Sequence, residues 1–278
     1  MLQKNIKLYD LHLHSRFSSD SEADPAAEIE AAIKAGLSGM CFTEHNDFDY
    51  DNPESPNLFK LDFDDYTKNL FSIRDDFSFR SDAPEIYIGL EQGLTLPAGD
   101  RIESYDPEGK LDFIIGSSHV VDGLDPYYPQ FWSDKTIAEG VKRYFEYIYE
   151  CVKTLNNFDV YGHLDYITRY IPDKSLKDNH DHLIPMDLIH EILSVLIHKG
   201  KGIEINTAGW RKSYHANPSA PIIKLYKEMG GEIITTGSDA HSAADIGHGI
   251  VRAVNVLKEC GFKYVTFFSR RKPVFVSI

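Results

Sequence analysis

Short apolar segments alternate with longer amphipathic segments along most of the chain. Apolar runs predict eight short strands, at residues 6–13, 39–45, 85–90, 111–118, 158–161, 202–205, 232–236 and 264–268. Helical spacing of apolar side chains predicts helices at residues 26–35, 62–77, 136–155, 187–198, 218–229 and 251–260. Short strands separated by helices are typical of an α/β protein with a parallel sheet.

A closed or nearly closed TIM-like barrel is the architecture that this alternation favours. Long loops follow several predicted strands, where barrels of this kind build their active sites. A doubly wound open sheet is the alternative, but no Gly-x-Gly-x-x-Gly motif follows the first strand. No break in composition marks a boundary, so we expect residues 1–278 to form a single domain.

The first predicted strand ends in the sequence His12-Leu13-His14. Side chains two residues apart in a strand point to the same face, so the two imidazoles project side by side. Two imidazoles held in this way form half of a metal site. A His-x-His pair also occurs by chance with a structural role, so the rest of the chain decides between the two interpretations.

Metal-binding side chains recur at the ends of the other predicted strands. If the sheet closes, these ends lie on one rim of the barrel. Imidazoles and carboxylates without thiols suit zinc, manganese or iron, and such a set exceeds what one ion uses. A carboxylate such as Glu91 bridges two ions through its two oxygens. The set comprises His12, His14, His45, Glu91, His119, His163, Asp239 and His241.

Charge and cysteine content narrow the class of partner. The chain has 29 Lys and Arg against 43 Asp and Glu, a formal net charge of −14. This charge disfavours nucleic acid and anionic membranes as partners, and an anionic substrate needs local cations. Three widely spaced cysteines suit a reducing compartment. Residues 1–5 lack the apolar region of a signal peptide and no apolar run is long enough to span a bilayer, so we expect a cytoplasmic protein.

As a set, the strand-end residues resemble the signature of the PHP (polymerase and histidinol phosphatase) superfamily. The resemblance implies a distorted (β/α)7 barrel with two to three divalent metal ions, zinc, manganese or iron. For a chain of this length it further implies hydrolysis of L-histidinol phosphate in histidine biosynthesis. The residues that carry it are His12-Leu13-His14, Thr43-Glu44-His45, Glu91, His119, His163 and Asp239-Ala240-His241.

The resemblance also implies a ligand set for each ion. The first ion would use His12, His14, Glu91 and Asp239, and the second would use Glu91, His119 and His163. The third would use His45 and His241, with Asp20 as its carboxylate on the basis of spacing in the loop. Strand alternation directs Glu44 away from His45, so Glu44 is left out of the site.

Direct in-line attack by a metal-bridging hydroxide, without a phosphoenzyme, is the mechanism that we expect. Phosphate also favours planar guanidinium donors. Arg169 and Arg211 follow predicted strands and are candidates to bind it, with Arg16 as a third. His248, between two glycines, is a candidate to protonate the leaving alcohol or to touch the substrate.

Two alternative functions remain open at this stage. The first is a phosphoesterase of the same superfamily that acts on nucleotides or other small phosphate esters. The second is a non-catalytic metal-binding module, which the intact ligand set disfavours. The oligomeric state is not predicted. Loop aromatics offer surfaces for substrate selection without pointing to one determinant; they are Phe17, Tyr127, Tyr128, Phe131, Trp132 and Trp210.

Overall fold

Seven parallel strands form the central sheet of the computed structural model, which describes residues 6–48, 50, 58–106, 108–177, 180–212 and 215–278. The strands neighbour one another in chain order, and every adjacent pair is parallel. They are β1 (Tyr9–Leu13), β2 (Gly39–Asn46), β3 (Glu85–Gly93), β4 (Phe113–Ser117), β5 (Val160–Tyr161), β6 (Gly202–Asn206) and β7 (Ile234–Gly237).

Strand β1 and the segment after β7 close the sheet into a barrel. Leu13 and Ala240 form a parallel bridge. The His14 amide donates to the Ala240 carbonyl at 2.8 Å, and the Asp239 amide donates to the His12 carbonyl at 2.8 Å. The predicted nearly closed α/β barrel is therefore confirmed, and the doubly wound open sheet is excluded. The bridge also makes β1 and the 237–241 turn neighbours in space.

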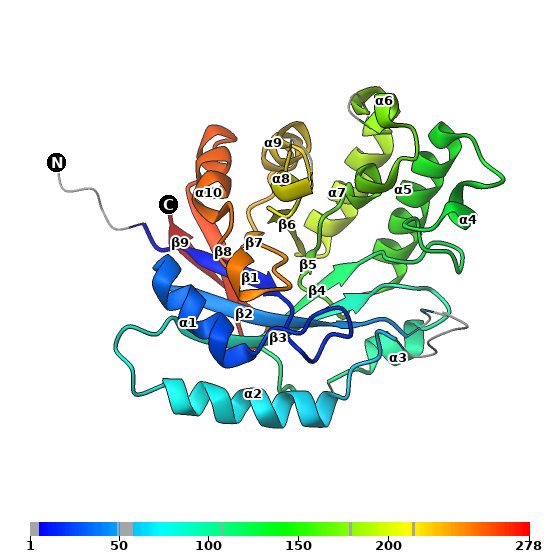
Figure 1. Cartoon of the computed structure of the whole chain (residues 1–278). Coiled ribbons are helices and arrows are strands. Elements are labelled where there is room, and N and C mark those ends of the chain that lie inside the picture. The colour runs from blue at the N-terminus through cyan, green and yellow to red at the C-terminus, as the bar shows by residue number, and fades with distance from the viewer. Residues whose placement is uncertain (1–5, 49, 51–57, 107, 178–179, 213–214) are drawn as a thin grey trace.

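Helices surround the strands on the outside of the barrel (Figure 1). The α-helices are α1 (Pro25–Ala35), α2 (Phe63–Phe77), α3 (Gly99–Glu103), α4 (Pro129–Trp132), α5 (Ile137–Thr154), α6 (Lys174–Lys177), α7 (Met186–His198), α8 (Gly209–Lys212), α9 (Ala220–Glu228) and α10 (Ile250–Glu259). Within the described ranges, three 3-10 helices lie in the loops, η1 (Tyr166–Tyr170), η2 (Asp181–Leu183) and η3 (Ala243–Asp245). All six predicted helices are present, with ends that differ by one or two residues.

Local capping explains where the long helices start. The Asp24 side chain accepts from the amides of Ala26 and Ala27, and Pro25 occupies the first helical position of α1. Gly36 ends α1 with φ 70°, a left-handed conformation that costs glycine little. Thr136 and Glu139 form a reciprocal capping box at the start of α5. These contacts orient the chain so that apolar helix faces meet the barrel strands.

The predicted strand at 264–268 is confirmed, and it lies outside the seven-stranded barrel sheet. Strand β8 (Tyr264–Ser269) pairs antiparallel with β9 (Lys272–Ser277), and this hairpin is separate from the barrel sheet. Arg270 and Arg271 form its two-residue turn, both with positive φ. Two-residue hairpin turns normally contain Asn or Gly, so the Arg pair gave no sequence signal that a hairpin follows β8. Phe267 stacks on Tyr9 at 4.8 Å between ring centroids, so the hairpin covers the barrel end where β1 begins.

Other departures from the predicted elements are small. Strand β1 begins at Tyr9, three residues later than predicted, while β2 and β3 each extend past the metal-binding residue that was expected to end them. Within the described ranges, no helix combines the length and apolar character needed to cross a membrane. Residues 1–5, on which the expectation of no signal peptide partly depends, lie outside the described residues.

Candidate metal centre

Metal-binding side chains converge at the carboxyl ends of the barrel strands. His12, His45 and Glu91 belong to the last part of β1, β2 and β3. Further along the chain, β4, β5 and β7 are each followed at the second position by a metal-binding residue. This regular placement arises because parallel strands all point their carboxyl ends to one rim. The three residues of this second set are His119, His163 and Asp239.

The first group in the cluster combines the two histidines of β1 with two carboxylates. The Nε2 atoms of His12 and His14 lie 3.1 Å apart. Glu91 Oε2 lies 3.2 Å from His12 Nε2 and 3.4 Å from His14 Nε2. Asp239 Oδ1 lies 3.9 and 3.6 Å from the same two nitrogens. Four potential ligand atoms therefore face one point, with all four side chains buried.

Glu91 occupies the middle of the cluster and directs its two oxygens to different neighbours. Its Oε1 lies 2.8 Å from His163 Nε2 and 3.3 Å from His119 Nε2. Its Oε2 lies 3.0 Å from His45 Nδ1, in addition to the His12 and His14 nitrogens. A carboxylate with this arrangement suits a bridging position between two ions.

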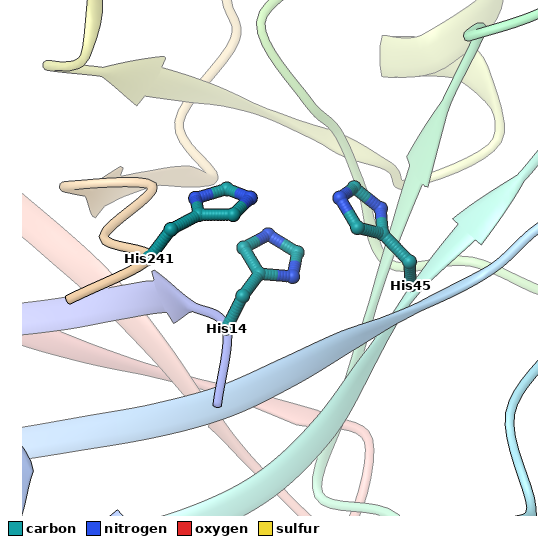
Figure 2. A group of neighbouring side chains, drawn as sticks. All are labelled: His14, His45 and His241. Carbon is teal, nitrogen blue, oxygen red and sulfur yellow. The ribbon is translucent and has the colours of Figure 1, made fainter. Parts of the chain in front are cut away.

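A further group of imidazoles surrounds His14 (Figure 2). His14, His45 and His241 come from the ends of β1 and β2 and from the loop after β7, with the rings of His45 and His241 4.1 and 4.4 Å from the His14 ring. Asp20 Oδ2 lies 3.1 Å from His241 Nε2 and 3.6 Å from His45 Nε2. The loop after β1 thus brings Asp20 to the position that spacing had suggested.

Burial and neighbouring charges shift the pKa values of the side chains in the cluster. Burial alone would raise the pKa of Glu91, but the imidazoles of His12, His119 and His45 hold that pKa well below its usual range. Burial likewise opposes the charging of His45, yet Glu91 and Asp20 raise the pKa of His45 to about 10. His14 shows the opposite effect, because burial and the neighbouring His45 and His241 lower its pKa well below the usual value. Positive charge is therefore favoured among these carboxylates, which is what bound cations supply.

Unpaired buried atoms provide a test of whether these residues fit metal ions. Among the described residues, four buried side-chain atoms in the cluster make no hydrogen bond: Glu91 Oε2, His45 Nδ1, Asp47 Oδ2 and His163 Nδ1. Buried polar atoms are normally paired, so such a concentration needs an explanation. Nitrogen and carboxylate donors without a thiol suit zinc, manganese or iron. The donor set fits bound divalent cations, and so do Glu91 Oε2 and His45 Nδ1, which lie 3.0 Å apart as an ion pair without forming a hydrogen bond.

Two carboxylates that sequence reasoning missed orient the histidines from behind. Glu204 Oε1 accepts from His12 Nδ1 at 2.7 Å, and its Oε2 accepts from the His163 amide at 3.0 Å. Asp47 Oδ1 pairs with His119 Nδ1 at 2.9 Å. Such partners fix the ring and leave Nε2 free for a metal. Glu204 could have been recognised as a site residue because it is the only acid in the apolar strand 202–205. Asp47 could have been recognised because it follows the candidate ligand His45 by two residues.

Glu44 lies outside the cluster. Its carboxylate accepts from the amide and hydroxyl of Ser15 and from the hydroxyl of Ser18. Ser18 Oγ in turn lies 3.1 Å from His14 Nδ1 and accepts from the His45 amide at 3.0 Å. Glu44 therefore supports two histidines through Ser18 without facing the cluster itself.

A cavity of about 390 Å³ opens onto the cluster. Its size is in the range of small-ligand sites. Carboxylates, imidazoles and aromatic rings dominate its walls. The described residues that line it are Asp20, His45, Asp47, Tyr50, Leu58, Phe59, Glu91, His119, Asp125, Tyr127, Tyr128, His163, Tyr166, Arg169, Tyr170, Asp239 and His241.

The three candidate arginines lie in different environments. Arg169 is buried and lines the cavity, with its Nε donating to Asn217 Oδ1 at 2.8 Å and its Nη2 to Asn206 Oδ1 at 2.9 Å. Arg211 instead donates to the carbonyls of residues 238 and 239 at 2.8 and 2.9 Å, and Arg16 pairs with an exposed aspartate. Neither Arg211 nor Arg16 belongs to the described cavity lining.

His248 and most of the loop aromatics are likewise not brought to the cavity. His248 is exposed between η3 and α10, and its carbonyl accepts from Thr207 Oγ1 at 2.5 Å. Tyr127 and Tyr128 line the cavity. The other loop aromatics considered from the sequence are absent from the described lining; these are Phe17, Phe131, Trp132 and Trp210.

The barrel and its rim of imidazoles and carboxylates define a metal-dependent α/β-barrel hydrolase. A family model described as the PHP domain matches residues 10–208. The chain belongs to the PHP domain family.

Relatives match over nearly the whole chain. A histidinol-phosphatase from Lactococcus lactis is 32% identical over 270 residues, with 96% of each chain covered. The crystal structure of histidinol phosphate phosphatase from Lactococcus lactis, complexed with zinc, L-histidinol and phosphate, has a TM-score of 0.82 at 30% identity and covers 97% of this chain and 99% of that one. A structure from Listeria monocytogenes shares the fold, with a TM-score of 0.72 at 19% identity over 88% and 99% of the two chains.

Proposed function

We propose that this protein is a histidinol-phosphatase that hydrolyses L-histidinol phosphate to L-histidinol and phosphate in histidine biosynthesis. The observation that carries the proposal is the position of Glu91 and Arg169 in one cavity. Glu91 is surrounded by imidazoles and Arg169 supplies the guanidinium. The Lactococcus lactis relative, complexed with zinc, L-histidinol and phosphate, supports the same substrate.

The ligand sets follow from the donor atoms described above. His12, His14, Glu91 and Asp239 would hold one ion, and Glu91, His119 and His163 would hold a second. Asp20, His45 and His241 would hold a third. Two to three divalent ions per chain are proposed, with zinc, manganese or iron as the metal. Hydrolysis of a phosphate monoester is slow because neutral water is a weak nucleophile and because the phosphoryl oxygens are negatively charged. When bound, such ions lower the pKa of water and neutralise the phosphoryl oxygens.

The side chains provide the binding and orientation. Arg169 offers Nη1, which lies 3.4 Å from Asp239 Oδ2, to a phosphoryl oxygen beside the cluster. Asn206 and Asn217 fix the guanidinium plane, so little side-chain entropy is lost when phosphate binds. Glu204 and Asp47 hold His12 and His119 in the orientation that presents Nε2. Water attacks phosphorus directly, and no side chain forms a phosphoenzyme.

Further parts of the proposal concern the protein as a whole. Residues 1–278 act as one domain, supported by pairing of β7 with β6 and by the bridge from β1 to Ala240. The net charge of −14 supports a small phosphorylated substrate instead of nucleic acid. A cytoplasmic location is proposed on the grounds of composition and the biosynthetic reaction.

A substrate panel tests the function. Purified protein loaded with zinc or manganese is assayed for phosphate release from L-histidinol phosphate, from nucleoside monophosphates and from sugar phosphates. We expect the highest kcat/KM for L-histidinol phosphate. Preference for nucleotides would refute this substrate while leaving phosphoester hydrolysis intact, and no hydrolysis of any ester would favour a non-catalytic metal-binding protein.

A further inference from the structure

One aromatic wall of the cavity extends from the metal centre to Asp125. Phe59 packs edge-on against His45 with ring centroids 5.1 Å apart, and Tyr50 packs against Phe59 at 4.6 Å. The Tyr50 hydroxyl then donates to Asp125 Oδ2 at 2.9 Å. This series of contacts places Asp125 two rings away from a metal-binding histidine.

A second aromatic wall reaches the same residue from His163. Tyr166 lies against His163 with centroids 4.7 Å apart, and Tyr170 follows Tyr166 at 4.9 Å. Tyr127 packs on Tyr170 at 5.6 Å, and the Tyr127 amide donates to Asp125 Oδ1 at 2.7 Å. Both walls therefore begin at metal-binding histidines and end at Asp125. Asp125 therefore lies in the same cavity as the metal-binding histidines, at the far end of both series of contacts.

Asp125 has no lysine or arginine partner among the described residues of the cavity. Arg169 is the only lysine or arginine in that lining, and its guanidinium is held by Asn206 and Asn217. The two donors to Asp125 are a phenol and an amide, and each carboxylate oxygen keeps a free lone pair. A half-buried carboxylate in this state attracts a cationic ligand and repels an anionic one.

The titration of Asp125 agrees with this geometry. Burial raises the pKa of Asp125, and the nearby Asp47 carboxylate adds to the increase. Hydrogen bonds from the Tyr127 amide and the Tyr50 hydroxyl act in the opposite direction, and so does the charge of His119. Asp47 is itself buried and lines the cavity with an unpaired Oδ2.

We propose that Asp125 binds the protonated amine of the departing alcohol, so that the enzyme selects phosphate monoesters of amino alcohols. This inference rests on the proposed function, since it assigns the group that recognises the amine of L-histidinol phosphate. An ester with a second anionic group at this position meets the Asp125 carboxylate and is disfavoured. Selection therefore depends on a residue in the loop after β4 that binds no metal.

The test compares Asp125→Asn with wild type on two substrates. One is L-histidinol phosphate, and the other is 3-(imidazol-4-yl)propyl phosphate. The second compound differs from the first only in lacking the amine, and therefore the stereocentre at the carbon that carries it. The quantity measured is the ratio of kcat/KM between them. We expect wild type to favour the amine by about 10- to 100-fold, as for one hydrogen bond between charged groups. Asp125→Asn should reduce the ratio to near one.

Asp134→Asn is the matched control, because Asp134 is exposed, lies near the same loop and is absent from the described lining. It should keep the wild-type ratio. The inference is overturned if Asp125→Asn lowers kcat/KM equally for both substrates, because that result indicates a structural role or recognition of the imidazole. An unchanged ratio overturns it as well.

Failure of the proposed function has a different signature. If wild type releases no phosphate from L-histidinol phosphate, the same ratio is measured with O-phosphoethanolamine and ethyl phosphate. A preference for the amine that disappears in Asp125→Asn would retain the role of Asp125 and reject only L-histidinol phosphate as the substrate. A ratio that does not depend on Asp125 would reject the role itself.

Discussion

His12 and Glu204 form a buried pair in which His12 Nδ1 donates to Glu204 Oε1 at 2.7 Å. The bond turns His12 Nε2 toward His14 and Glu91. Glu204 also accepts from the His163 amide, so one carboxylate orients parts of two strand ends. A carboxylate behind a histidine both fixes the ring and increases its basicity as a ligand.

Glu204→Gln should weaken metal binding without unfolding the barrel. The amide keeps the shape of the side chain but loses the charge that holds His12, so we expect zinc affinity to fall by about 10- to 100-fold. Competition with a chelator of known affinity measures this change. Glu232→Gln, at an exposed position, is the control and should bind zinc as wild type does. Equal affinities for Glu204→Gln and wild type would contradict the orienting role.

His119→Ala should abolish turnover with little effect on the fold. The substitution removes a candidate ligand, so kcat should fall by more than about 100-fold, the upper end of what loss of an orienting partner alone costs. Steady-state kinetics and thermal unfolding followed by circular dichroism measure the two effects. His190→Ala changes an exposed histidine of α7 and serves as the control. Activity close to wild type in His119→Ala would reject the ligand assignment.

Removal of metal should lower both activity and stability. Without cations, Glu91, Asp239 and Asp20 repel one another, and ions that bind only the folded chain stabilise it by about 2.7 kcal/mol at a concentration of 100 Kd. We expect a chelator to abolish phosphate release and to lower the melting temperature, and zinc to restore both. Elemental analysis of the active protein should find two to three ions per chain. Fewer than two would exclude the multinuclear centre.

Arg169→Lys and Arg211→Lys should have separable effects. Lysine at 169 lacks the planar donors, so KM and the inhibition constant of inorganic phosphate should rise by about 10-fold or more. Arg211 donates hydrogen bonds to the carbonyls of Ser238 and Asp239. Asp239 has φ 54°, a left-handed conformation that is unfavourable for residues other than glycine. Arg211→Lys should therefore weaken zinc binding with less effect on phosphate. If Arg211→Lys weakened phosphate binding and Arg169→Lys weakened zinc binding, the roles assigned to the two arginines would be wrong.

Glu28→Gln should stabilise the protein at neutral and alkaline pH. Burial and the carboxylates of Glu44 and Asp10 raise the pKa of Glu28 to about 9, and both its side-chain oxygens lack partners among the described residues. Between the ordinary glutamate pKa of 4.5 and the raised pKa of about 9, the folded chain keeps a proton that the unfolded chain releases, so stability falls as pH rises through this window.

The amide resembles the protonated acid, so Glu28→Gln should raise the free energy of unfolding by roughly 1–3 kcal/mol near pH 7.5. At about pH 4 the two proteins should be equally stable, because the acid is then protonated in both states. Urea titrations at the two pH values measure the difference. Glu30→Gln, on the exposed side of α1, should change stability by less than about 0.5 kcal/mol. A pH-independent effect of Glu28→Gln would contradict the buried-acid interpretation.

The sequence by itself determined the barrel class and predicted which residues gather at the candidate metal centre. Strands buried on both faces must be apolar along their length, so histidines and acids that end such runs are conspicuous. His12, His45, His119 and His163 each follow or end an apolar run, and parallel strands bring those ends to one rim. The strand pattern therefore carried local information that sufficed to predict this part of the molecule.

Only the tertiary structure decided which distant residues support that rim. Glu204 and Asp47 act across strands, through hydrogen bonds that no local spacing encodes. Arg169 and Arg211 both follow strands, yet loop packing turns one into the cavity and the other onto a backbone. The structure likewise pairs β8 with β9 in a hairpin outside the barrel sheet. The pattern of apolar residues in a strand reflects local burial. These contacts depend instead on how loops that are distant in the sequence pack together, which the local sequence does not determine.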